Sequence, residues 1–469
     1  MKAYTPTIGI EVHAELKTRT KMFCNSLNDP HAGEPNTHVC PICMAHPGTL
    51  PVINKTAVKH VLKVGTAIEG TLASYTEFDR KNYFYPDIPK GYQISQYLYP
   101  LVVGGTVNGV AITRVHLEED TARSLHDQGE GSIVDYNRAG VPLMELVTEP
   151  VIHDAKTAGD FARELQLLLR TLGVSDANME KGEMRVEANI SVSDTHIYGT
   201  KVEVKNLNSF KSVEGAIEFE IKRQVALLEE GGKVIQETRG WDEAMGKTFS
   251  QRIKESANDY RYFPDPDLPK LSVTMSDEFS LSRLSEELPE LPIKKRLKYN
   301  DLGLSREQIE IIISNSTIGN FFESTLSYLN DDTAIAKLVG NYITTDLLPA
   351  LENNDSHVVP DSRTFSELML MVAHAEISSR VAKDLLSEVV FEGKNPRDLA
   401  TLRNLFQSSS EEALVSLVDE ILKNHEGVVL EYKEGKESAL QFLVGQGMKL
   451  SKGSANPEVL LNIIKKKLG

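Results

Sequence analysis

Alternating apolar and polar residues predict three strands in the first 210 residues. Residues 8–13 read IGIEVH, and residues 185–192 (RVEANISV) and 202–207 (VEVKNL) alternate in the same way. A period of two places the apolar side chains on one face of a sheet and the polar ones on the other. The expected polar faces carry Glu11 and His13 on the first strand, Arg185, Glu187 and Asn189 on the second, and Glu203 and Lys205 on the third.

Apolar residues spaced by three and four predict helices over 154–172 and 211–229. Asp154 suits the start of the first helix, and Gly173 suits its end. The second helix is expected to end at the glycine pair that begins at Gly231.

Two prolines in the segment 288–292 (LPELP) mark a domain boundary, because proline interrupts both helices and strands. Beyond it the pattern is almost entirely helical, and 393–397 (GKNPR) predicts a second loop. We therefore expect an α+β domain over residues 1–292, a helical domain over 293–397 and a small helical tail domain over 398–469.

Composition favours a water-soluble protein of several domains. The 469 residues include three cysteines, too few for a disulfide framework, and no apolar run of membrane-spanning length. These features exclude a fibre or a membrane channel and predict a cytoplasmic protein. The net charge is −16, and residues 1–292 hold 31 basic and 42 acidic side chains. Such a chain is not a general DNA-binding protein, and a polyanion could bind only through local patches, such as the lysine-rich last twenty-one residues.

Histidine and carboxylate side chains recur at positions that could hold a divalent cation. The motif 116–120 (HLEED) and Glu145 accompany Glu11 and His13 of the first strand. A cation held by such groups commonly bridges nucleotide phosphates, although charged strand faces are more often simply solvated. Strict alternation places Glu118 with His116 and leaves Glu119 on the opposite face unless the chain bends.

The three cysteines allow two interpretations. Cys40 and Cys43 have the spacing of a zinc knuckle, with Cys24 upstream. A closed zinc site needs a fourth ligand, which one of the nearby histidines could supply: His31, His38 or His46. The alternative is three reduced thiols without metal.

Two segments interleave basic and aromatic residues: 78–97 (FDRKNYFYPDIPKGYQISQY) and 259–269 (DYRYFPDPDLP). Such segments can stack bases and neutralise phosphate, or they can be aromatic loops folded onto the domain. The chain has neither a phosphate-binding GxxxxGK[ST] loop nor a GxSxG nucleophile motif. We therefore do not expect it to hydrolyse an amide by itself.

Taken together, these motifs resemble the B-subunit family of the bacterial glutamyl/aspartyl-tRNA amidotransferases. The resemblance rests on IGIEVHAELKTRTKMFC, CPICMAHPGTLPVIN, HLEEDTARSLH, NRAGVPLMELVTEP, KVEVKNLNSF, QETRGWDEAMGKT, FLVGQGMKLSKGSANPEVL and the two aromatic segments. It extends in one register from about residue 4 to the C-terminus.

The resemblance implies a fold and an activity. The fold is a cradle built on an antiparallel sheet, then a helical domain, then a tail that holds tRNA. The activity uses ATP and Mg²⁺ to phosphorylate the side-chain carboxylate of Glu-tRNA(Gln) or Asp-tRNA(Asn). Ammonia from an amidase-type A subunit then displaces the phosphate, in a heterotrimer completed by a small C subunit.

The resemblance also implies site residues. His13, Glu119 and Glu145 match the family's Mg²⁺ ligands, while Glu11 and Glu118 suit a second cation or water-bridged contacts. The catalytic group comprises Glu11, Glu118, Arg185 and Lys205, and the ATP and substrate pocket comprises Glu187, Asn189, Glu203 and Asn206.

Two positions depart from the family pattern: Ser26 replaces a cysteine of the zinc-bearing members, which puts zinc in doubt, and Gly447 replaces an apolar residue.

Two other functions remain open. The chain could be a non-catalytic component that presents tRNA, or an independent zinc hydrolase.

Overall fold

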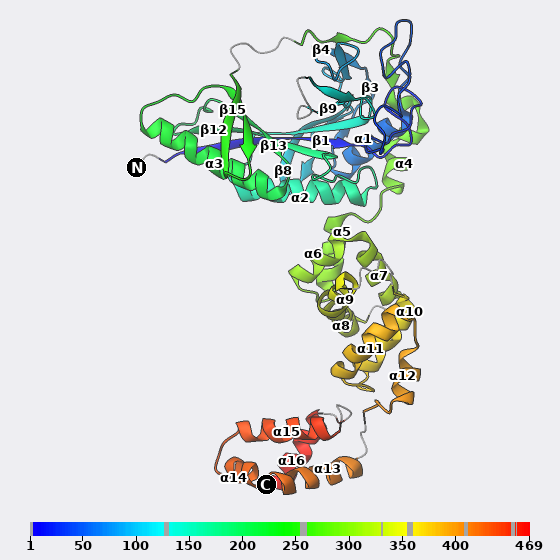
Figure 1. Cartoon of the computed structure of the whole chain (residues 1–469), viewed down its shortest axis with the longest axis vertical. Coiled ribbons are helices and arrows are strands. Elements are labelled where there is room, and N and C mark those ends of the chain that lie inside the picture. The colour runs from blue at the N-terminus through cyan, green and yellow to red at the C-terminus, as the bar shows by residue number, and fades with distance from the viewer. Residues whose placement is uncertain are drawn as a thin grey trace. The chain divides into compact units, whose positions relative to one another are not determined.

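The computed structural model describes residues 3–125, 131–253, 260–329, 332–353, 360–407, 411–451, 455 and 457–469. Asp259, the first residue of one aromatic segment, lies outside them. The chain divides into two compact units, Met1–Leu291 and Pro292–Gly469 (Figure 1). In the described residues, no helix is both long and apolar enough to cross a membrane.

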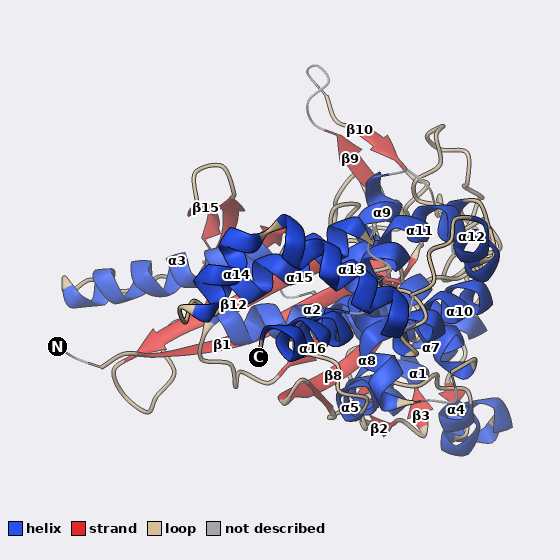
Figure 2. Cartoon of the chain, turned by 90° about the horizontal axis from the view of Figure 1, so that it is seen from below, coloured by secondary structure: helices blue, strands red, loops and turns tan. Residues whose placement is uncertain are grey.

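A ten-stranded sheet organises the first unit. Its strands follow in the spatial order β15 (Lys247–Ile253), β14 (Glu237–Asp242), β13 (Val202–Leu207), β12 (Met184–Ser193), β1 (Thr5–Glu15), β11 (Pro142–Thr148), β8 (Val110–Glu119), β6 (Val102–Val103) and β2 (Thr71–Leu72), and β7 (Thr106–Val107) pairs with β8. Figure 2 shows β1 and β12 as long neighbouring strands. These contain two of the predicted strands, and β13 has the predicted bounds.

The sheet is antiparallel except for one pair, β13 and β14, which is parallel. The reason is the helix α3 (Phe210–Glu229), which follows β13 and returns the chain so that β14 runs in the same direction. The expectation of an α+β fold built on an antiparallel sheet is confirmed, with this one parallel pair as a difference.

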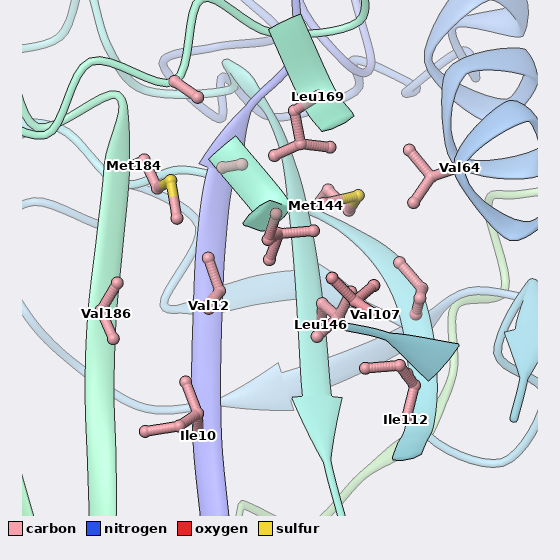
Figure 3. Packing of buried hydrophobic residues seen from close by; sticks show 14 of the residues in the cluster. Ile10, Val12, Val64, Val107, Ile112, Met144, Leu146, Leu169, Met184 and Val186 are labelled. Carbon is pink, nitrogen blue, oxygen red and sulfur yellow. The ribbon is translucent and has the colours of Figure 1, made fainter. Parts of the chain in front are cut away.

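Helices cover the apolar face of the sheet. Ile10 and Val12 of β1 are fully buried, and they pack in one cluster with Leu169 of α2 (Ala155–Thr171) and Val64 of α1 (Lys55–Ala67) (Figure 3). Asp154 caps α2 by accepting a hydrogen bond from the Thr157 backbone N–H, as its position predicts. The short helix α4 (Leu281–Glu286) ends this unit's helical structure.

Smaller ribbons lie outside the main sheet. One contains β16 (Phe263–Pro264), β4 (Asp79–Asn82) and β5 (Tyr92–Ser95), in that order. The others pair β10 (Ile133–Asp135) with β9 (Arg123–Leu125), and β17 (Leu271–Ser272) with β3 (Tyr75–Thr76). The first ribbon joins the two aromatic segments that the sequence singled out.

The second unit is helical. It contains α5 (Pro292–Asp301), α6 (Arg306–Ser314), α7 (Ser316–Ser327), α8 (Thr333–Tyr342), a π-helical turn (Ile343–Leu347), α9 (Leu348–Asn353), α10 (Ser362–Ala373), α11 (Ser379–Phe391), α12 (Pro396–Leu402), α13 (Glu411–Asn424), α14 (Glu426–Lys433), α15 (Ser438–Leu450) and α16 (Pro457–Leu468). Pro292 begins α5, a position where proline is tolerated because its missing N–H would have no helical partner.

The expected boundary at residue 397 falls inside α12, which Asn395 caps and which packs on α10 and α11. A separate apolar cluster begins at Leu414 and includes Ile421, Leu443 and Leu460. The division of the second unit into two domains stays a prediction, and the packing places the change of core after α12.

Gly447 lies where α15 meets two neighbouring helices. A Cβ atom built there would overlap the Leu460 side chain of α16 and lie 3.1 Å from Ile421 Cδ1 of α13. The departure from the family pattern therefore has a packing reason: this chain fills the position with Leu460.

We expect Gly447→Leu to destabilise the tail. Overpacking costs about 1–3 kcal/mol, which exceeds the gain of about 1 kcal/mol from replacing a helical glycine. Hydrogen exchange of α15 and α16 in the full-length chain should accelerate, and a second change, Leu460→Ala, should partly restore protection.

Gly445→Leu is the matched control, because a Cβ atom at that position of the same helix meets nothing within 4 Å. Equal exchange in the two glycine variants would contradict this packing role of Gly447.

Candidate active site

One row of polar residues crosses four strands on the face opposite the apolar core. His13 of β1 pairs directly with Glu145 of β11 on one side and with Arg185 of β12 on the other. Glu145 in turn pairs with His116 of β8. Directly paired residues share a face with their Cβ atoms about 4.5–5.5 Å apart, so the register brings these side chains together.

Two further carboxylates lie on the same face: Glu11, two residues from His13 on β1, and Glu118, two residues from His116 on β8. The Nε2 atom of His13 lies 3.4 Å from Glu145 Oε2, 3.5 Å from Glu118 Oε1 and 3.8 Å from Glu11 Oε1. His116 Nε2 lies 3.5 Å from the same Oε2 atom of Glu145. Five side chains distant in sequence therefore form one compact cluster, which we call the acidic cluster: Glu11, His13, His116, Glu118 and Glu145.

The acidic cluster holds excess negative charge. Burial favours the neutral imidazole of His13, but its contact with Glu145 and the charge of Glu118 outweigh burial and raise its pKa to about 9. Burial and the charge of Glu145 raise the pKa of Glu11 to about 7. Burial also disfavours ionised Glu145, yet His116 and His13 hold its pKa well below the ordinary value.

These residues fit a divalent cation. Two sets offer ligand atoms that all lie within 4.8 Å of one another: Glu11, His13 and Glu145, and His116, Glu118 and Glu145. Because metal ligands must be deprotonated, a cation that binds here would displace the protons that the crowded carboxylates and imidazoles retain. Carboxylate oxygens suit Mg²⁺, whereas the imidazole nitrogens also suit Mn²⁺ or Zn²⁺.

Glu119 lies apart from the acidic cluster. Its carboxylate forms an ion pair with Lys90 and accepts a hydrogen bond of 3.0 Å from the Ile94 backbone N–H. The cause is strand alternation, since Glu118 and Glu119 project to opposite faces of β8. The structure therefore does not bring Glu119 together with His13 and Glu145, and the carboxylate of this motif that lies near His13 is that of Glu118.

The other predicted polar residues extend the site along β12 and β13. Arg185 Nη1 lies 2.9 Å from Asp120 Oδ2. Lys205 Nζ lies 2.9 Å from Glu187 Oε2 and 3.6 Å from Glu203 Oε1, so Glu187 and Glu203 share one ammonium group. Asn189 pairs with Glu203 across the strands, and its buried Oδ1 has no hydrogen-bond partner among the described residues.

Asn206 has a backbone role that the sequence did not predict. The pairing of β12 with β13 shifts by one residue between Val186 and Ala188, and Asn206 has φ +66°. Asparagine tolerates this left-handed conformation, which commonly occurs at a β-bulge. Its side chain is exposed, outside the acidic cluster.

The three cysteines form a second cluster, distinct from the first. Cys43 Sγ lies 3.3 Å from Cys24 Sγ, 3.6 Å from Cys40 Sγ and 3.4 Å from Ser26 Oγ. In the part of the chain that the structure describes, no histidine nitrogen joins the three thiols. His31 instead faces Glu183, and His38 faces the Asp29 backbone carbonyl. Zinc binding remains an open prediction because the fourth neighbour is a serine hydroxyl.

His116 is the cluster member that the sequence named only as part of the motif 116–120 and did not assign as a ligand. The available signal was its spacing of two residues from Glu118, which predicted a shared face. That His116 also pairs with Glu145 is a long-range register that one sequence does not reveal.

Comparison with known proteins gives two family matches. Residues 6–278 match the GatB/GatE catalytic domain, and residues 320–468 match the GatB domain. The chain is 43% identical to the B subunit of the aspartyl/glutamyl-tRNA(Asn/Gln) amidotransferase from Moorella thermoacetica, an alignment covering 99% of this chain and 100% of that protein. It is 42% and 41% identical to the corresponding B subunits from Caldicellulosiruptor saccharolyticus and Persephonella marina, covering 99% of each chain. The whole length, including the strands that carry the acidic cluster, thus belongs to the GatB family, the B subunits of tRNA-dependent amidotransferases.

Proposed function

We propose that this chain is the component of the amidotransferase that activates and amidates the aminoacyl group of mischarged tRNA. Its substrates are Glu-tRNA(Gln) or Asp-tRNA(Asn), ATP and ammonia, and its products are Gln-tRNA(Gln) or Asn-tRNA(Asn), ADP and phosphate. Membership in the GatB family supports this reaction. The observation that carries the proposal is the acidic cluster, in which two sets of three side chains, both containing Glu145, offer ligand atoms close enough to hold a cation.

Activation is needed because a carboxylate is a poor acyl donor to ammonia. Its negative charge repels the nucleophile, and oxide is a poor leaving group. In the proposed reaction, a carboxylate oxygen attacks the γ-phosphorus of ATP and ADP leaves. Ammonia then attacks the acyl carbon and loses a proton as phosphate departs.

The acidic cluster would hold Mg²⁺ through His13, Glu118 and Glu145, with Glu11 and His116 beside them. When bound, the cation offsets negative charge on the phosphoryl oxygens. Substrate would reach the site from the side of Glu11, since 26% of its side chain is exposed whereas Glu118 and Glu145 are buried.

Residues of β12 and β13 would form the part of the substrate site that adjoins the acidic cluster. Lys205 is held by Glu187 and Glu203, so its ammonium group is fixed in position before substrate arrives. Arg185 is fixed in the same way by Asp120. The unpartnered Oδ1 of Asn189 suits a hydrogen-bond donor of ATP or of the aminoacyl end.

The partners follow from the same reaction. Ammonia would come from an amidase-type A subunit, with a small C subunit completing a heterotrimer. The helical tail, whose last turn carries Lys465, Lys466 and Lys467, would contact the tRNA backbone.

Loss of cluster residues should abolish turnover. We expect His13→Ala and Glu145→Ala to lower glutamine-dependent conversion of mischarged tRNA by at least about 100-fold, because charge on the transferred phosphoryl group loses its stabilisation. The assembled complex should retain tRNA binding. His153→Ala and Glu218→Ala, both exposed, are the matched controls.

Near-normal turnover by the His13 and Glu145 variants would instead indicate that the chain only presents tRNA and supports the chemistry of a partner. That outcome would reject the catalytic role.

Neighbouring glutamates should differ in metal binding. We expect Glu118→Gln to weaken Mn²⁺ binding by at least about 10-fold, since it removes a ligand charge from the acidic cluster. Glu119→Gln should leave the affinity within a factor of about two, because Glu119 pairs with Lys90. Titration followed by electron paramagnetic resonance measures both, and the reverse order would restore Glu119 as the ligand.

A further inference from the structure

Lys81 projects from a ribbon that is fixed beside the acidic cluster. In the ribbon, Lys81 of β4 pairs with Gln93 of β5, and Asp79 pairs with Ser95. Side chains of directly paired residues share a face, as do those two residues apart along a strand. Lys81 therefore lies on the same face of the ribbon as Gln93 and Ser95.

That face is turned toward β8, which carries two members of the acidic cluster. Ser95 Oγ donates a hydrogen bond of 3.2 Å to Glu118 Oε2, and Gln93 Nε2 donates one of 2.7 Å to the Glu119 backbone carbonyl. Nearby, the Leu117 backbone N–H donates to Gln96 Oε1 at 2.9 Å. These bonds hold the ribbon in place, so the position of Lys81 is set independently of substrate.

The ammonium group of Lys81 is held by an aromatic ring rather than by a carboxylate. Its Nζ lies 5.2 Å from the centroid of the Tyr260 ring, a cation–π contact. Burial lowers the pKa of Lys81, but the charges of Glu118 and Glu145 outweigh burial and raise it above the ordinary value. The positive charge of Lys81 is therefore stabilised by two members of the acidic cluster, Glu118 and Glu145.

Other cations around the site already have acidic partners. Lys90 pairs with Glu119, Lys205 with Glu187, and Arg185 with Asp120. Arg80, the chain neighbour of Lys81, pairs with Asp265 and Asp267. Among the described residues, no carboxylate lies within 4.0 Å of Lys81 Nζ, so its hydrogen-bond donors remain available to an anionic ligand.

We propose that Lys81 is a catalytic residue that binds the phosphoryl group transferred from ATP to the aminoacyl carboxylate. This assignment rests on the proposed function. The Nζ group donates hydrogen bonds to phosphoryl oxygens while the oxygen–phosphorus bond to ADP breaks and the bond to the carboxylate oxygen forms. It remains an ammonium group throughout, and it continues to bind the phosphate when ammonia displaces it.

The charges of the site favour this role over a structural one. A phosphoryl group entering a cluster of three glutamates meets repulsion that one cation on the sheet face only partly offsets. Lys81 approaches from the ribbon rather than from the sheet, so an anion between them would contact positive charge on two sides.

The test compares Lys81→Met with Lys81→Arg in the assembled complex, using mischarged tRNA, ATP and free ammonia as the amide donor. Free ammonia makes the assay independent of the glutaminase partner. We expect Lys81→Met to lower kcat by about 100- to 1,000-fold, as removal of one donor to developing charge does elsewhere. The KM for tRNA should change by less than about threefold, and Lys81→Arg should recover at least about tenfold of the lost kcat.

A second measurement separates catalysis from support of the site. Mn²⁺ binding to Lys81→Met should be unchanged or tighter, because the variant removes a positive charge from the neighbourhood of the ligands. Lys222→Met is the control, since Lys222 is 78% exposed on α3.

Each other outcome overturns the assignment. Normal kcat in Lys81→Met shows that the ammonium group is not needed, and lost Mn²⁺ binding shows a structural role. A raised KM for tRNA with normal kcat shows a tRNA contact instead, and inactivity of Lys81→Arg equal to that of Lys81→Met shows that positive charge is not the requirement.

Normal turnover by both His13→Ala and Lys81→Met would reject the proposed function together with the role of Lys81. Normal turnover by Lys81→Met alone would reject only the role of Lys81.

Discussion

The register of β1 between β11 and β12 is the constraint on which the site depends. It sets His13 opposite both Glu145 and Arg185, while β11 sets Glu145 opposite His116. A slip of β1 by one residue would turn Glu11 and His13 toward the apolar face and separate them from Glu145. Such a slip would also expose Ile10 and Val12, which are fully buried. The hydrophobic core and the geometry of the candidate site are therefore specified by the same strand pairing.

Local structure was largely predictable from the sequence because it depends on neighbours in the chain. Alternation located β1, β12 and β13, and the spacing of leucines with Asp154 at the start located α2 to within one residue at each end. The order of strands in space was not predictable, because it depends on pairings between strands that other elements separate in the chain. The parallel pairing of β13 with β14 is an example, since it follows from how α3 returns the chain.

In the candidate site, too, local features were predictable from the sequence and long-range ones were not. Polar faces of single strands were predicted, and the structure brings His13, Glu11, Glu118 and Glu145 together. Family resemblance favoured Glu119 over Glu118, whereas alternation along β8 favoured Glu118, and the geometry follows alternation. Lys81 stood in an aromatic segment whose partner strand was unknown, so its position beside the acidic cluster could not be foreseen. The ribbon that joins β4 to β5 and β16 determines it.

A row of acids on one sheet face opposes folding, because like charges on neighbouring strands repel and burial adds a desolvation cost. The raised pKa of Glu11 expresses this cost, because burial and the charge of Glu145 disfavour its ionised form. The raised pKa of His13 has the opposite meaning, since attraction of the protonated ring to Glu145 and Glu118 offsets part of the repulsion. The opposite face of the same strands offsets the cost, with Val12, Met144 and Val186 packed in one buried cluster (Figure 3). Replacing the acids with apolar residues would relieve the repulsion but would leave nothing to bind a cation. The proposed function gives this arrangement a reason that stability does not, since a cation bound there would relieve the repulsion and serve the proposed reaction.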